Sequence, residues 1–121
     1  MASAVKFEAF SEHLAEGVHN LDTGLIKILL SNAAPSAAAD AVKTDLTSEL
    51  STANGYTSGG EDTQNATSRS GGTTTVTAVD VVWTASGGSI GPFRYVVAYN
   101  DTPTSPADPL IGWDDCGSAV T

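Results

Sequence analysis

The stretch from Val76 to Asp101, VTAVDVVWTASGGSIGPFRYVVAYND, is the most strand-like part of the chain and constrains its fold most strongly. Two runs rich in Val and aromatic residues flank the break SGGSIGP, a pattern that predicts a β-hairpin with a longer loop. Side chains alternate between the two faces of a strand. In the first run, one face would carry Val79, Val81 and Trp83, and the opposite face Asp80, Val82 and Thr84. In the second run, one face would carry Phe93, Tyr95, Val97 and Tyr99, and the opposite face Arg94, Val96, Ala98 and Asn100. Neither run has a wholly polar face, so we expect both strands to lie centrally, covered on both sides by protein or by a partner chain.

The length and composition favour one small β domain. At 121 residues the chain fits a single domain, residues 1–121. Only 16% of the residues are charged, and Gly, Ser, Thr and Ala are abundant, which is typical of β-structure with many turns. The sequence therefore predicts a mainly β fold, a small antiparallel β-sandwich or barrel-like domain with one short N-terminal helix.

The charge distribution limits the classes of partner. The net charge is −9, and the five basic residues are scattered along the chain. Phosphate binding needs clustered Lys and Arg, so nucleic acid is not an expected partner. The longest apolar run, Leu25–Leu30, is interrupted by Lys27 and is too short to span a bilayer, and the N-terminus lacks the apolar core of a secretion signal. We therefore expect no membrane partner and synthesis in the cytoplasm.

One amphipathic helix is predicted near the N-terminus, over about residues 7–17. Phe7, Phe10 and Leu14 recur at three- and four-residue spacing, and Gly17 is a plausible stop. A helix this short must lie on an apolar surface, and the same spacing puts His13 on or near its polar flank.

Further strands and loops follow from local composition. Leu25–Leu30 is predicted to be a strand with both faces mostly apolar. Residues 51–72 are rich in Gly, Ser and Thr and predict a long polar surface loop with Tyr56 as its one large apolar anchor. Leu110–Trp113 is predicted to be a short last strand, and Asp114–Gly117 a turn.

No pattern in the sequence assembles convincing catalytic chemistry. His13, Glu16, His19 and Asp22 have HxxExxHxxD spacing, but the turn signals at Asn20–Gly24 end the helix, and capping or surface roles compete with metal binding. The Gly-rich segment 86–91 precedes a strand, whereas a phosphate-binding loop opens a helix. A single cysteine, Cys116, is expected to be a small, partly buried residue. The chain is predicted not to be an enzyme and to need no cofactor or metal.

Eight large apolar side chains are the candidates for the core or for a subunit interface. Aromatic residues in such positions more often form a core or an interface than a ligand groove, although a groove for sugar or receptor remains an alternative. The eight are Phe7, Phe10, Leu14, Trp83, Phe93, Tyr95, Tyr99 and Trp113.

Four phrases of the chain, AEGVHNL, NGYTSGG, VVWTASGGSIGPFRYVVAYND and DPLIGWDD, resemble a family of small virion proteins of tailed bacteriophages. The resemblance covers about residues 7–120 and is most specific between Val82 and Asp101. The chain departs from the family at residues 61–72, where it is more polar. It also departs at its C-terminus, where the family tends to continue with further strands, so the last sheet is expected to be incomplete or completed by a neighbouring subunit.

The resemblance implies a structural protein of the virion. The expected function is a capsid decoration or cement protein that stabilises the head, with the major capsid protein or another virion protein as partner. The alternative is a tail- or fibre-associated module that binds a host glycan or receptor. By analogy with decoration proteins we expect a homo-oligomer, a trimer.

Overall fold

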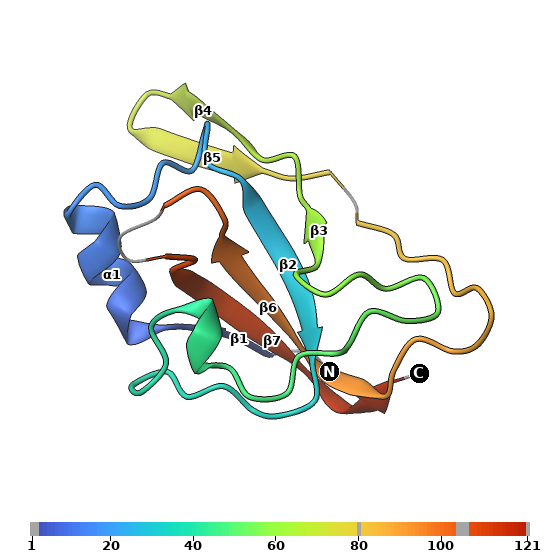
Figure 1. Ribbon diagram of the computed structural model, residues 1–121. Helices are drawn as coiled ribbons and strands as arrows, with labels where there is room; N and C mark the ends of the chain where they lie inside the picture. The colour runs from blue at the N-terminus through green and yellow to red at the C-terminus, as the bar shows by residue number, and fades with distance from the viewer. Residues whose placement is uncertain (1–2, 80, 104–106, 121) are drawn as a thin grey trace.

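The computed structural model describes residues 3–79, 81–103 and 107–120. Its strands are antiparallel and form a five-stranded main sheet, in the order β1-β7-β6-β2-β3, and a separate two-stranded hairpin, β4-β5 (Figure 1). The prediction of a mainly antiparallel β domain with one short N-terminal helix is confirmed. The elements are β1 Ser3–Lys6, α1 Glu8–Ala15, β2 Ile26–Ser31, a 3-10 helix Lys43–Asp45, β3 Glu61–Asp62, β4 Ala66–Ser70, β5 Thr73–Thr77, β6 Phe93–Asn100 and β7 Leu110–Val120.

The core lies on one face of the main sheet. In the registers of β6 with its two neighbours, Val97 is opposite both Leu29 and Trp113, so these three side chains share a face. Phe7, just before α1, is fully buried, and its ring centroid lies 4.7 Å from that of Trp113. The buried cluster consists of Phe7, Leu29, Val97, Tyr99 and Leu110, with Phe10, Leu46 and Trp113 packed against it.

The predicted central hairpin is only half correct. Its second run is β6, but β6 pairs with β2 and β7, which occupy both of its edges. No edge of β6 is left for the first run, and residues 81–92 contain no strand. Val82 is 78% exposed, as expected for a run that has lost its pairing partner. Asp80, assigned to one face of this run, lies outside the described residues.

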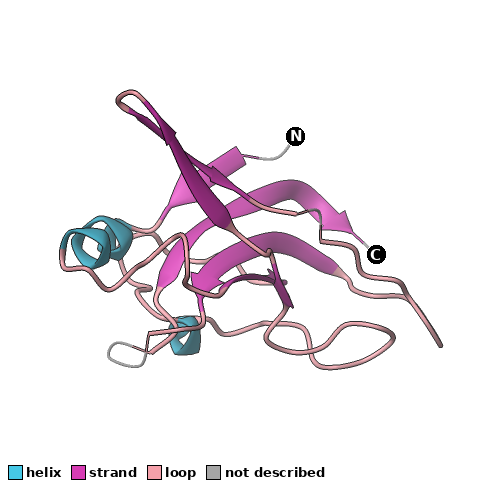
Figure 2. Cartoon of the chain, turned by 90° about the horizontal axis from the view of Figure 1, so that it is seen from above, coloured by secondary structure: helices cyan, strands magenta, loops and turns pink. Residues whose placement is uncertain are grey.

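The polar stretch 51–72 is not a single loop. It contains β3, which pairs with β2, and β4, which pairs with β5 in a hairpin that projects from the main sheet (Figures 1 and 2). Thr and Ser fill this exposed hairpin, where pairing between strands needs no buried face. Tyr56 is the apolar anchor that the sequence predicts, and it is 1% exposed.

The helix lies within its predicted range, but a different side of it faces the protein. Phe7 and Phe10 point inward as expected, whereas Leu14 is 45% exposed and His13 only 9% exposed. His13 and Leu14, three and four residues after Phe10, lie on either side of Phe10 around the helix. The sheet lies on the His13 side. Leu14 is therefore not part of the core, which leaves a subunit interface as its predicted role, and the prediction that His13 lies on the polar flank is wrong.

The C-terminal strand is longer than predicted. Leu110–Val120 forms one strand, in place of a short strand followed by a turn at Asp114–Gly117. The register between β6 and β7 shifts between Phe93 and Tyr95, so the turn-like residues form an irregularity within the strand. The segment before Phe7 supplies β1, an unpredicted strand that pairs with β7.

Candidate interaction surface

The outer face of the main sheet carries apolar side chains that the protein only partly covers. By register, Ile28 lies opposite Ala98, and Leu30 lies opposite Val96, on the face away from the core. Leu30 is buried, but Ile28, Val96 and Ala98 are each only half-buried. The strand β6 therefore has the two apolar faces that its sequence predicts, one in the core and one partly open to solvent.

These side chains line a shallow groove of about 460 Å³. Phe10 and Ile111 also contribute to its lining, so α1 and the start of β7 border it. The two charged residues of the lining are Lys6 on β1 and Asp114 on β7. Lys6 donates a hydrogen bond of 2.5 Å to the Ser11 hydroxyl. An apolar groove with few charges is suited to contact with another apolar surface.

The structure divides the eight predicted residues among several environments. Phe7 and Tyr99 are buried in the core, with Phe10 and Trp113 half-buried against it. Trp83 and Phe93 line a second hollow, of about 310 Å³, together with Leu30 and Ile90. The remaining two are half-buried Tyr95, on β6, and exposed Leu14, on α1.

The second hollow contains an indole without a partner. Trp83 is half-buried, its ring centroid lies 5.8 Å from that of Tyr56, and its Nε1 is buried without a hydrogen-bond partner among the described residues. Aromatic rings beside an apolar surface can pack against the apolar face of a ligand.

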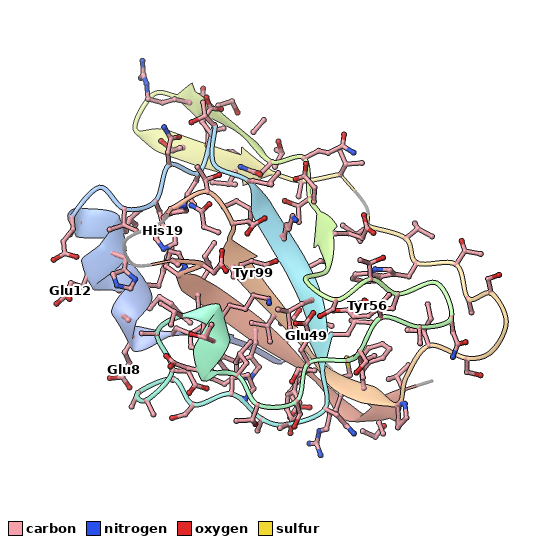
Figure 3. The ribbon with its side chains drawn as sticks, viewed as in Figure 1. Glu8, Glu12, His19, Glu49, Tyr56 and Tyr99 are labelled. Atoms are coloured by element: carbon pink, nitrogen blue, oxygen red, sulfur yellow. The ribbon has the colours of Figure 1, made fainter. Side chains whose placement is uncertain are left out.

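A buried polar cluster that the sequence did not reveal fixes the loop before β3. The Tyr56 hydroxyl donates to a Glu49 carboxylate oxygen at 2.8 Å and accepts the Leu30 N–H at 3.1 Å. Glu49 also pairs with Lys43 at 3.4 Å, and the Tyr99 hydroxyl donates to the Gly59 carbonyl. Figure 3 shows Glu49, Tyr56 and Tyr99 over the strands β2 and β6.

This cluster has a structural role. Burial is the main cause that raises the pKa of both Tyr56 and Tyr99, so both hydroxyls stay protonated and act as donors. Both hydroxyls donate hydrogen bonds, to Glu49 and to the Gly59 carbonyl, and both side chains are almost fully buried, so these bonds fix the loop against the sheet. The spacing of Glu49, Tyr56 and Tyr99 along the chain matches no known motif. The turns and strand pairing of the folded chain bring them together, so the sequence alone could not reveal this cluster.

The HxxExxHxxD residues do not converge. The His13 and His19 rings lie 6.1 Å apart, but Glu16 and Asp22 are exposed. Across the described residues, no group of three or more His, Cys, Asp or Glu side chains is arranged to hold a metal ion. The metal interpretation of this spacing therefore has no assembled ligand set to support it.

The acidic residues outside the groove mostly join neighbouring strands and loops. Asp115 accepts two hydrogen bonds from Arg94, at 2.7 and 3.1 Å, and this interaction lowers the pKa of the Asp115 carboxyl. Asp101 pairs with Lys27 at 3.0 Å, which ties the loop after β6 to β2. Cys116 is a free cysteine that is half-buried, as the sequence predicts, but it lies in β7 and not in the predicted turn.

Comparison with protein-family models, curated proteins and solved structures found no match to this chain. In the part of the chain that the structure describes, α1 and the 3-10 helix are both too short to cross a membrane.

Proposed function

We propose that this protein is a structural component of a tailed-phage particle, most favourably a capsid decoration protein that binds the major capsid protein through the outer face of its main sheet. The observation that carries the proposal is the apolar groove over Ile28, Val96 and Ala98. Covering such a surface removes apolar area from water and contributes roughly 25 cal/mol for each Å² buried. A cement protein gains stability in this way only on the assembled particle.

Two further observations support the proposal. The four phrases that resemble small phage virion proteins include all of β6 and the start of β7, the strands that form the floor of the groove. The net charge of −9 keeps the free subunit soluble and disfavours unspecific self-association before a partner is met. A homo-oligomer, a trimer by analogy, and location in the virion belong to the same proposal.

The proposed role requires no catalysis. The polar side chains of the cluster around Tyr56 already bind one another: Tyr56 donates to Glu49, and Glu49 pairs with Lys43. A catalytic site would instead need an acid, base or nucleophile poised toward an open cleft.

A second candidate is a tail- or fibre-associated module that binds a host glycan or receptor. The hollow beside Trp83 and Phe93 favours it, because two aromatic side chains line this hollow. Sugars bind to aromatic rings through their apolar faces and supply hydroxyl oxygens as acceptors.

The test compares two variants on particles that lack this protein. Val96→Asp places a charge in the groove, and Val76→Asp places the same charge on the exposed β4-β5 hairpin, where Val76 is 49% exposed. Circular dichroism establishes that both variants are folded. We expect the wild type and Val76→Asp to add density to the heads in cryo-electron microscopy and Val96→Asp to add none. Wild-type density on the tail would support the second candidate, and equal head binding by both variants would overturn the role of the groove.

A further inference from the structure

Two histidines are buried together where α1 meets the end of the main sheet. His13, in α1, is 9% exposed, and His19, in the turn that follows, is 7% exposed. Their ring centroids lie 6.1 Å apart, and His13 Nδ1 and His19 Nε2 are both buried without a hydrogen-bond partner. Figure 3 shows His19 between α1 and the strands. The His19 ring also packs on Phe10, with centroids 5.1 Å apart.

Asn100, the last residue of β6, fixes the protonation state of His19. The Thr102 N–H donates to Asn100 Oδ1 at 3.1 Å, so the amide nitrogen Nδ2 must face the other way, toward His19 Nδ1, at 3.2 Å. Nδ2 can only donate, so His19 Nδ1 must accept, and the ring is neutral with its proton on Nε2. Gly24 leaves room for the amide, because a Cβ at that position would lie 3.0 Å from Asn100 Nδ2.

Protonation of His19 would break this arrangement. A proton on Nδ1 would face the two protons of the Asn100 amide, and the amide cannot turn without losing its bond to Thr102. Burial lowers the pKa of His19, and the neighbouring His13 lowers it further. The charged imidazole is therefore disfavoured while α1 is docked.

No described charge compensates for that proton. None of the ion pairs in the described part of the chain includes an imidazole. The carboxylates of the surrounding elements point to solvent or pair elsewhere. They are the exposed Glu8, Glu12 and Glu16 of α1 and its end, the exposed Asp22 of the following turn, and Asp101 after β6, which pairs with Lys27 of β2.

We propose that His19 is an acid-sensitive latch: its neutral ring joins α1 to β6, and its protonation releases α1 and the turn that follows. The contact that the proton breaks is the bond to Asn100, and the packing of the ring on Phe10 is lost only when α1 leaves the sheet. The released ring is hydrated and takes up its proton freely, so acid pulls the equilibrium toward the open form.

The direction of the pH dependence follows from the lowered pKa. The docked form holds fewer protons than the open form, so docking is fully stable above about pH 6.5, the ordinary histidine value, and weakens below it. For one proton, the opening equilibrium constant rises about fivefold between pH 6.5 and pH 5.5. As the pH falls further, the increase in this constant approaches about tenfold for each pH unit, until the pKa of the docked ring is reached.

The test is nuclear magnetic resonance on the whole chain. Imidazole nitrogen shifts at pH 8 should show His19 neutral with its proton on Nε2, and amide exchange in α1, corrected for intrinsic rates, should show opening that rises about fivefold from pH 6.5 to pH 5.5. A proton on Nδ1 at pH 8, or opening that does not change over this range, would overturn the proposal.

A matched variant, Asn100→Asp, separates the latch from general acid sensitivity. Its carboxylate would accept a hydrogen bond from protonated Nδ1 while still accepting one from Thr102, so the charged ring becomes the favoured form. Opening of α1 should then fall as the pH is lowered from 8 to 6. The same acid-driven opening in this variant as in the wild type would contradict the latch. If the variant does not fold, the wild-type shifts and exchange still decide.

Discussion

Replacing Tyr56 by Phe tests whether one hydroxyl anchors the long connection between the 3-10 helix and β3. The ring would keep its packing against Trp83, at 5.8 Å between centroids, and only the oxygen would be lost. That oxygen accepts a hydrogen bond from the Leu30 N–H, on the edge of β2 that faces away from β6. It donates a second hydrogen bond to the Glu49 carboxylate. The change therefore removes two hydrogen bonds and almost no apolar area.

The expected loss is about 2–3 kcal/mol of the free energy of unfolding. Most of it comes from the Leu30 N–H, which is left buried without an acceptor, at about 1–3 kcal/mol, because Leu30 is 2% and Tyr56 1% exposed. Glu49 loses one donor but keeps the Gly59 N–H and Lys43, so its contribution is smaller, about 1 kcal/mol or less.

Urea denaturation followed by tryptophan fluorescence measures the effect, and Tyr95→Phe is the matched control. The half-buried Tyr95 lies on β6, and no hydrogen bond of its hydroxyl occurs in the described residues, so its loss should change stability by less than about 0.5 kcal/mol. If Tyr56→Phe cost no more than Tyr95→Phe, the Tyr56 hydroxyl would not be an anchor, and the account of this cluster would be wrong.

Two further comparisons test the packing by thermal denaturation. Gly60→Ala should cost more than about 2 kcal/mol, because its φ is +79° and a Cβ there would lie 1.8 Å from the Ile28 carbonyl oxygen; Gly71→Ala, with no atom within 4 Å, should cost only roughly 1 kcal/mol for its φ of +61°. Equal losses would argue against the close approach of the two backbones. Phe7→Ala should cost about 3–5 kcal/mol and Leu14→Ala less than about 0.5 kcal/mol, since Phe7 is fully buried and Leu14 is 45% exposed. A larger loss of stability at Leu14 would mean that Leu14 packs inward, as the sequence predicts.

Local composition was enough to predict several elements. The β-branched and aromatic runs that became β2 and β6, and the spacing that became α1, carry preferences that act within a few residues. The two apolar faces of β6 were also readable, because side-chain alternation depends only on the strand itself. Tyr56 stood out as the one large apolar residue in a polar stretch.

The partners of these elements could not be predicted in the same way. The run 79–84 is as strand-like in sequence as β6, yet its described residues, Val79 and 81–84, form no strand, because β2 and β7 fill both edges of β6. The inward side of α1 depended on where the sheet lies relative to Phe10, which brought His13 inside and left Leu14 outside.

The sequence by itself determined which segments can be strands or helix, and that β6 needs cover on two sides. Only the tertiary structure decided that the core fills one side and that a half-open groove remains on the other. It also placed His19 against Asn100, 81 residues away. Pairing across such distances depends on which edges and faces are already occupied, and no local pattern contains that information.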